Sequence, residues 1–113
     1  MITRITLVEA RAALREATRA SLVGAGFEVE EYETGEAALE GMRARPSEAL
    51  VTDCTLDGIG GAELAARART GNHGSALFVV AMAERGDAAP PAAFDEVLAK
   101  PVDMDALIAL LRR

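Results

Sequence analysis

The stretch ALFVVAM, residues 76–82, carries the strongest strand signal in this chain. Every residue in it is apolar, and its valines and phenylalanine favour extended backbone over helix. A strand without polar alternation is typical of a parallel sheet that is buried on both faces. The stretch therefore predicts an α/β protein in which helices cover both sides of the sheet.

Short apolar strands alternate with helical patterns outward from this stretch. Further strands are predicted at residues 5–8, 27–30, 49–52 and 96–99. Helices are predicted over residues 12–25 and 62–69, and after Thr34 and Asp103, whose side chains can cap a helix. Gly26 suits the end of the first helix, because glycine readily adopts the left-handed conformation found there.

The segment after the central stretch breaks this alternation. A helix is expected over residues 84–94, but Pro90-Pro91 excludes a normal helix interior. The pattern therefore predicts a doubly wound, five-stranded parallel sheet whose fourth helix is shortened or lost.

Length and composition fit one domain over residues 1–113. Half of the residues are hydrophobic and 27% are charged, which excludes a disordered tail. Cys54 is the only cysteine, which excludes an internal disulfide and a cysteine-based zinc site. We find no apolar run long enough to span a membrane and no signal-peptide pattern, so we expect a cytoplasmic protein without membrane contact.

The charge pattern argues against a nucleic-acid partner. The net charge is −6, and the arginines are scattered among acidic residues instead of forming a basic stripe. Tryptophan is absent and there is one tyrosine, so no aromatic platform for stacking bases is available. The chain has eleven arginines but a single lysine, Lys100.

Ionic side chains fall at the carboxyl ends of the predicted strands. Glu9 follows the first strand, Asp53 the third and Lys100 the fifth. Because the carboxyl ends of parallel strands form the binding edge of an open α/β sheet, we expect these three side chains to meet there.

In this order the residues resemble the receiver domain of bacterial two-component response regulators, over essentially the whole chain. That family has an acidic pair, a phosphoacceptor aspartate, a serine or threonine and a Lys-Pro pair after its first, third, fourth and fifth strands. The resemblance implies the flavodoxin-like strand order 2-1-3-4-5. It assigns Asp53 as phosphoacceptor, Lys100 as the phosphoryl contact, and Lys100-Pro101 as a typically cis peptide bond. Gly61 stands at the glycine that precedes the family's third helix.

The resemblance also implies Mg²⁺ at Asp53, because a cation offsets the repulsion between a carboxylate and a phosphoryl group. Its ligands would be Glu9, Asp53 and the backbone carbonyl of Thr55. The second residue of the acidic pair is Ala10, so one carboxylate ligand is missing. We therefore expect weakened Mg²⁺ binding.

Three further departures concern how phosphorylation would be reported. Ala83 replaces the hydroxyl residue after the fourth strand, and Val97 replaces the aromatic switch residue on the fifth. The segment from Ala83 to Lys100 is also shorter than in the family. The family's coupled hydroxyl–aromatic switch is therefore not expected to operate.

Structural roles stay open for the same residues. Lys100 would equally suit a structural ion pair with Asp53. Glu9 would also suit the role of a solvated acid at the start of a helix. Asp53 would also suit the role of a cap for the turn that follows it. We expect their neighbours to be structural, with Arg11 exposed, Cys54 in the core and Asp57 facing solvent.

The sequence thus favours an atypical receiver domain in phosphorelay signalling that accepts a phosphoryl group on Asp53 and acts through protein contacts. The implied partners are a sensor histidine kinase or phosphotransfer protein and a downstream protein, with a homodimer as a further option. The alternative is a pseudo-receiver that binds a protein or small ligand without phosphorylation. An enzyme is not expected, because Thr55 stands two residues after Asp53, where hydrolases with an aspartate nucleophile generally carry a second acid.

Overall fold

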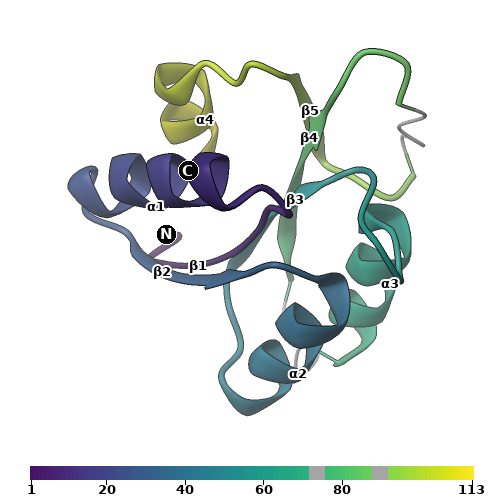
Figure 1. The fold of residues 1–113 in the computed structure, drawn as a ribbon. Helices are drawn as coiled ribbons and strands as arrows, with labels where there is room; N and C mark the ends of the chain where they lie inside the picture. Colours follow the sequence, from purple (N-terminus) through teal and green to yellow (C-terminus); the bar gives the residue numbers. More distant parts are fainter. Residues whose placement is uncertain (72–75, 88–91) are drawn as a thin grey trace.

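The computed structural model describes residues 1–71, 76–87 and 92–113, and it shows a central sheet between two layers of helices (Figure 1). The strands are β1 (Arg4–Val8), β2 (Glu28–Tyr32), β3 (Ala49–Asp53), β4 (Phe78–Ala83) and β5 (Glu96–Ala99). The helices of the described residues are α1 (Ala12–Gly24), α2 (Gly35–Ala44), α3 (Gly61–Gly71) and α4 (Met104–Leu111).

The sheet has the order β2-β1-β3-β4-β5, and every neighbouring pair is parallel. This confirms the predicted doubly wound α/β fold and its flavodoxin-like strand order. The register pairs Val8 with Thr52, Asp53 with Met82 and Ala83 with Ala99. The last residues of β1, β3, β4 and β5 therefore lie along one edge of the sheet.

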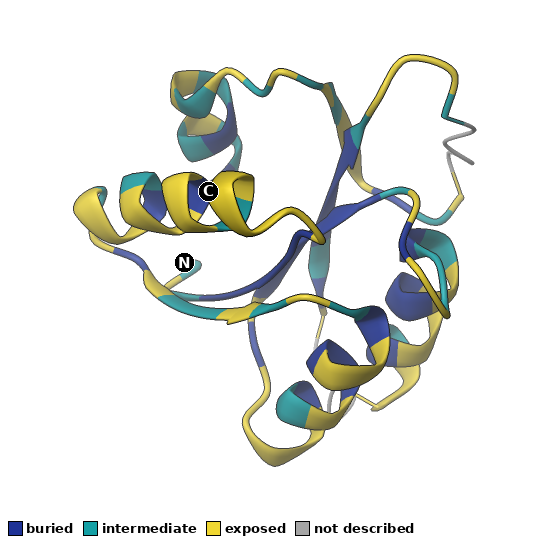
Figure 2. Ribbon diagram, viewed as in Figure 1, coloured by how far each residue is buried: buried dark blue, intermediate teal, exposed yellow. Residues whose placement is uncertain are grey.

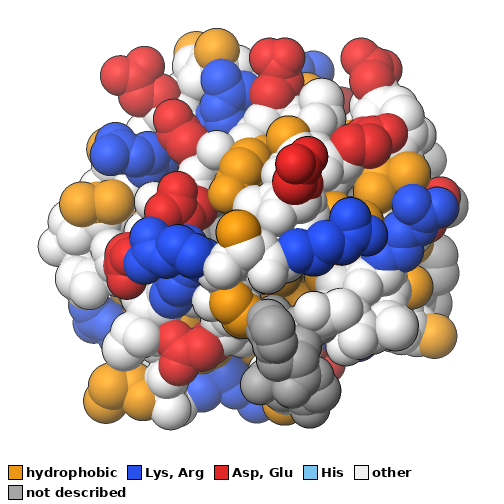
Figure 3. All heavy atoms as spheres, turned by 90° about the horizontal axis from the view of Figure 1, so that it is seen from below, with side chains coloured by type: hydrophobic (Ala, Val, Ile, Leu, Met, Phe, Trp, Pro, Cys, Tyr) orange, Lys and Arg blue, Asp and Glu red, His pale blue; other side chains and the backbone are white. Residues whose placement is uncertain are grey.

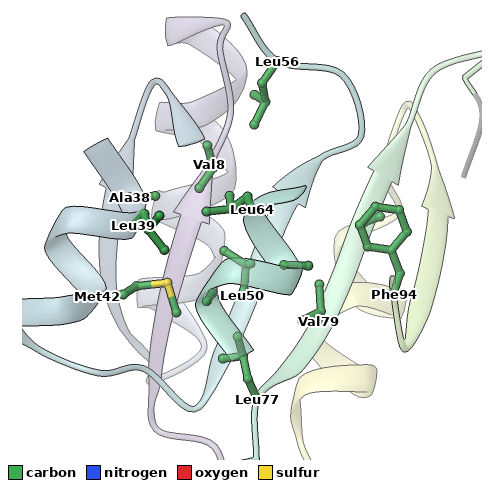
Figure 4. Close-up of a cluster of buried hydrophobic side chains, with 13 residues drawn as sticks. Val8, Ala38, Leu39, Met42, Leu50, Leu56, Leu64, Leu77, Val79 and Phe94 are labelled. Carbon is green, nitrogen blue, oxygen red and sulfur yellow. The ribbon is translucent and has the colours of Figure 1, made fainter. Parts of the chain in front are cut away.

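Two hydrophobic clusters hold the layers together, one on each face of the sheet. On one face, α2 and α3 pack against Val8, Leu50 and Val79 of the strands (Figure 4). On the other face, Leu22 of α1 and Leu107 of α4 belong to a second cluster with buried strand residues. The strands at the centre of the sheet are buried along their length, whereas the helices expose their outer sides (Figure 2). Such burial explains why the strands carry apolar residues without alternation.

The predicted helix signals act as expected. The Thr34 hydroxyl accepts a hydrogen bond from the Ala37 amide, and the Asp103 carboxylate accepts bonds from two amides in the first turn of α4. Gly26 has a φ of 102°, which glycine adopts without strain. β2 and β4 begin and end one or two residues later than predicted, because strand ends depend on pairing as well as on local sequence.

The segment between β4 and β5 lacks a helix in its described parts, residues 84–87 and 92–95. A turn with Gly86 at a φ of 91° follows β4, and Phe94 is buried in the cluster on the α2–α3 face. The predicted loss of a helix is thus confirmed over these residues, whereas Pro90-Pro91 lies outside the described part.

Within the described ranges, no helix is both long enough and apolar enough to cross a bilayer. On the face seen in Figure 3, acidic and basic side chains stand next to one another. Some of the ion pairs join different elements, as Arg4 and Arg45 do when both contact Glu28 and Glu30.

Candidate functional site

Three ionic side chains meet where the strands end, as predicted from the sequence. Glu9 follows β1, Asp53 is the last residue of β3, and Lys100 follows β5. The Lys100 ammonium lies 2.7 Å from Glu9 Oε1 and 2.6 Å from Asp53 Oδ1. The Lys100 amide donates to the carbonyl of Ala83, which fixes this loop against the end of β4.

Glu9 is fully enclosed, with 2% of its surface exposed. One carboxylate oxygen contacts Lys100, and the other accepts a hydrogen bond from the Arg11 amide at 2.9 Å. Its backbone carbonyl accepts a bond from the Arg15 guanidinium. The alternative of a solvated acid at a helix start is therefore wrong, because Glu9 is buried and both of its carboxylate oxygens have partners within the protein.

Asp53 is 5% exposed, and its two carboxylate oxygens have different surroundings. Oδ2 accepts a hydrogen bond from the Ala10 amide at 3.1 Å. Oδ1 accepts no hydrogen bond from the described residues, and its contact is the ion pair with Lys100. The residue that replaces the second acid thus supplies a backbone N–H to the phosphoacceptor position.

The electrostatics follow from two buried carboxylates that share one ammonium. Burial, followed by the neighbouring Glu9, raises the pKa of Asp53 to about 6, although Lys100 and the Ala10 amide favour its ionised form. Burial also acts against ionised Glu9, but its contacts with Asp53, Lys100 and the Arg11 amide outweigh it, so the pKa of Glu9 is lowered. Burial opposes the charge on Lys100, but its two carboxylate partners prevail and raise its pKa. The site therefore retains one excess negative charge when both acids are ionised.

A hollow of about 180 Å³ opens above these residues. It is also lined by Thr55 and by Glu84 and Asp87 of the turn after β4. The Thr55 hydroxyl donates to Asp87 Oδ1 at 3.0 Å, and Arg11 forms an ion pair with Glu84 at 2.9 Å. Sequence reasoning missed both acids, although their place directly after a strand was the signal that could have found them.

The structure also places the neighbouring residues. Arg11 is exposed, as predicted, and pairs with Glu84. Asp57 is exposed, also as predicted. Cys54 is half-buried against the α2–α3 cluster, and burial, with the charges of Asp87 and Asp53, raises the pKa of its thiol. The protonated thiol fits the predicted structural role. Val97 is 42% exposed on β5, so it forms no buried switch.

Comparison with protein families identifies this arrangement. The model of the response regulator receiver domain matches residues 5–112. The chain belongs to this family. Its cis Lys100-Pro101 bond and Gly61 at the start of α3 agree with the family's pattern.

Solved structures show the same fold as this receiver domain. A CheY-like receiver domain from Methylobacillus flagellatus is 26% identical, with a TM-score of 0.88 and coverage of 99% of this chain and 98% of that one. Full-length FixJ from B. japonicum is 26% identical, with a TM-score of 0.82 and coverage of 96% of this chain and 55% of that one. The chemotaxis response regulator CheY4 of Vibrio cholerae, at 18% identity, shares the fold, with a TM-score of 0.85 and coverage of 100% and 98%. A search of curated protein sequences gives no match.

Receiver domains typically bind Mg²⁺ at the phosphoacceptor, and the oxygen donors around Asp53 suit such an ion in part. Among the described residues, Asp53 Oδ1 contacts the Lys100 ammonium but accepts no hydrogen bond, and the carboxylates of Asp53 and Glu9 carry more negative charge than Lys100 neutralises. Among the described residues, no three His, Cys, Asp or Glu side chains converge closely enough to hold a metal by themselves. Oxygen donors that carry excess negative charge suit a divalent cation. Because only two carboxylates are present, they suit a cation that is weakly held.

Proposed function

We propose that residues 1–113 form an atypical receiver domain in cytoplasmic two-component phosphorelay signalling, in which Asp53 accepts a phosphoryl group. The observation that carries this proposal is the Lys100 ammonium 2.6 Å from Asp53 Oδ1, at the floor of a hollow that reaches the surface. A compact ammonium beside the attacking carboxylate suits a phosphoryl group, whose oxygens need positive charge.

The chemistry is one displacement at phosphorus. A carboxylate oxygen of Asp53 attacks the phosphorus of a phosphohistidine or an acyl phosphate, a P–O bond forms, and the bond to the donor breaks. A phosphohistidine donor leaves as imidazole, which takes its proton from solvent. With a pKa of about 6, Asp53 is mainly ionised at pH 7.5 and is therefore competent as nucleophile.

A divalent cation would be held by Glu9, Asp53 and the backbone carbonyl of Thr55, and it would neutralise charge that develops on the phosphoryl oxygens. Lys100 would hold one of these oxygens, and the Ala10 amide would keep the Asp53 carboxylate oriented. Ala83 has no hydroxyl to donate to another oxygen, so the phosphoryl group has fewer contacts than in other receivers.

Signal output would proceed through protein contacts, not through catalysis. The phosphoryl donor would be a sensor histidine kinase or phosphotransfer protein. The protein that the phosphorylated domain then contacts would be a downstream protein or a second copy of this chain. Thr55 supplies no second acid two residues after Asp53, which supports a signalling module over a hydrolase.

The test is intact-mass spectrometry after incubation with acetyl phosphate and Mg²⁺. We expect the mass of one phosphoryl group to be added to the native chain and to Asp57→Asn, whose exposed carboxylate serves as the matched control. The Asp53→Asn variant should gain nothing. Absence of an adduct on the native chain, also with a histidine kinase of its own organism, would contradict phosphorylation.

The second candidate is a phosphorylation-independent pseudo-receiver that binds a protein or small ligand. It is favoured by the ion pairs of Lys100 with both Glu9 and Asp53, which neutralise much of the site's charge without a metal. Under this alternative, Asp53→Ala would leave partner binding and cellular function intact. A loss of either in that variant would support the phosphoacceptor.

A further inference from the structure

The turn that follows β4 brings an unassigned carboxylate to the hollow above the phosphoacceptor. Asp87 lines this hollow together with Asp53 and Thr55. The acidic pair after β1 has lost its second carboxylate, because Ala10 stands there. Asp87 therefore comes from a different segment to the place where a carboxylate is missing.

Hydrogen bonds from two elements hold Asp87 in one orientation. Its Oδ1 accepts a bond from the Thr55 hydroxyl at 3.0 Å, and its Oδ2 accepts one from the Glu84 amide at 2.8 Å. The Asp87 amide donates to the Glu84 carbonyl at 3.0 Å, which closes a turn with Gly86 at its third position. Because a carboxylate has about four lone-pair sites, each oxygen of Asp87 can accept a further bond from a ligand in the hollow.

The charges that line the hollow indicate the sign of that ligand. Four carboxylates face one ammonium and one guanidinium. The guanidinium of Arg11 pairs with Glu84, and the ammonium of Lys100 is shared by the two buried acids. Asp87 has no cationic partner among the described residues. The lining thus keeps two negative charges in excess, which one divalent cation would neutralise.

The buried phosphoacceptor points to a ligand in the same hollow. Asp53 is 5% exposed, and its Oδ1 contacts Lys100 but accepts no hydrogen bond from the described residues. An oxygen in such a contact keeps a lone pair for a second cation. The hollow of about 180 Å³ has room for an ion with several waters, since a water takes about 30 Å³ in the liquid.

We propose that Asp87 supplies the carboxylate that the acidic pair has lost, and that it holds Mg²⁺ through a bound water. Across the described ranges, no three acidic, His or Cys side chains converge closely enough to bind an ion directly, so Asp87 is assigned to the water shell. Mg²⁺ keeps several waters when a protein binds it, and the groups that accept hydrogen bonds from them strengthen binding. The inference rests on the cation that the proposed function requires at Asp53, and Thr55 acts as the residue that positions Asp87.

The experiment is an NMR titration of the ¹⁵N-labelled chain with MgCl₂ at constant ionic strength and without a phosphodonor. We expect saturable shifts at the amides of Ala10, Thr55 and Asp87. Asp53→Asn should lose all of these shifts together, because one ion causes them. Absence of saturable shifts in the native chain, or shifts at Asp87 that persist in Asp53→Asn, would overturn the proposal.

A matched pair of variants tests the carboxylate itself. Asp87→Asn keeps the shape of the side chain but removes its charge, and it should weaken Mg²⁺ binding about tenfold. Asp57→Asn removes an exposed acid outside the lining and should weaken it less than about twofold. Equal affinities of Asp87→Asn and the native chain would contradict the assigned role.

A second pair tests how Asp87 is positioned. Thr55→Val removes the hydroxyl that Asp87 accepts from and should weaken Mg²⁺ binding about threefold, whereas Thr55→Ser keeps the hydroxyl and should bind as the native chain does. Equal affinities of these two variants would contradict positioning by Thr55. Urea unfolding of each variant establishes that it is folded.

Incubation with acetyl phosphate separates this inference from the proposed function. A native chain that binds Mg²⁺ more tightly than Asp87→Asn but gains no phosphoryl group would contradict phosphorylation and support the role of Asp87. A native chain that gains the phosphoryl group but binds Mg²⁺ no more tightly than Asp87→Asn would overturn the role of Asp87 alone.

Discussion

At the scale of single residues, Lys100 decides the character of the site. It is the only lysine of the chain, and it contacts two carboxylates that are each almost fully buried. Burying two carboxylates near each other is unfavourable, because both lose their contact with water. The one ammonium that contacts both of them therefore contributes strongly to the stability of the folded state. The amine thus holds Asp53 by an ion pair, and under the proposed function it would also contact a phosphoryl group on Asp53.

Lys100→Met is expected to lower the free energy of unfolding by about 3–5 kcal/mol at pH 7.5, because two buried acids would lose their shared cation. Urea unfolding measures this change. Arg19→Met removes an exposed cation that forms no ion pair with the described residues, and it should change stability by less than about 0.5 kcal/mol. Adding Asp53→Asn to Lys100→Met should restore part of the loss, and a loss of similar size in the two single variants would refute this account.

Asp53 gives stability a distinct dependence on pH. Its pKa is about 6 in the folded protein against an ordinary value of 3.8. Between these values the folded chain binds a proton that the unfolded chain has released, so the unfolding free energy falls as the pH rises from 3.8 towards 6 and levels off above it. We expect Asp53→Asn to be more stable than the native chain by about 2–3 kcal/mol at pH 7.5, with the difference shrinking towards pH 5.

Urea titrations at several pH values in EDTA measure this dependence. Glu9 has a lowered pKa, so its own contribution is lost only below its ordinary value of 4.5, outside this range. If the stability difference between Asp53→Asn and the native chain stays constant from pH 5 to 8, the pKa of Asp53 is not raised by its burial.

At the scale of elements, residues 92–95 before β5 cover part of the sheet face where a fourth helix was expected. Phe94 is 6% exposed and fills the cluster between the sheet and α3. Asp95 accepts a hydrogen bond from the Val79 amide at 2.7 Å and pairs with Arg69 of α3. The aromatic ring of Phe94 thus covers this part of β4, and the carboxylate of Asp95 accepts a hydrogen bond from its backbone.

Phe94→Ala is therefore expected to lower the free energy of unfolding by about 3–4 kcal/mol, because it removes a buried aromatic ring and leaves a cavity. Chemical denaturation of the purified variant measures the change. Val97→Ala, on the neighbouring exposed surface, should cost less than about 1 kcal/mol. Similar losses in the two variants would show that Phe94 does not support this face.

At the scale of the whole molecule, the sheet separates two independent cores and brings the ends of its strands to a common edge. Asp53 lies at this edge, and Val97 lies on the outermost strand with its side chain partly in solvent. Without a hydroxyl at Ala83, no side chain at that position can pull on a phosphoryl group and transmit movement to β5. A change at Asp53 is therefore expected to stay local.

We expect beryllofluoride with Mg²⁺, which mimics an acyl phosphate, to shift NMR signals around the hollow, at Ala10, Thr55 and Asp87. The signals of Val97 should stay in place, because Ala83 has no hydroxyl and Val97 no aromatic ring through which a phosphoryl group could act. Asp53→Asn, recorded under the same conditions, should show no shifts. Large shifts along β5 in the native chain would show that a switch operates by another route.

Much of the fold followed from local patterns. Apolar runs placed the five strands, Thr34 and Asp103 placed helix starts, and the rule for parallel sheets brought Glu9, Asp53 and Lys100 together. These predictions succeeded because each depends on side-chain polarity, capping groups or topology, which the sequence carries directly. Asp87 and Glu84 were missed because their place above the site depends on the turn after β4, not on a motif.

By itself, the sequence determined the α/β class, the edge of the sheet at which ionic side chains meet, and the identity of the three residues that meet there. Only the tertiary structure decided that Glu9 is buried, that Lys100 bridges both acids, and that the hollow above them is also lined by Glu84 and Asp87. Charge and periodicity are properties of single residues and their spacing, whereas burial and shared contacts arise between segments far apart in the chain. A carboxylate's neighbours therefore become known only when those segments are packed together.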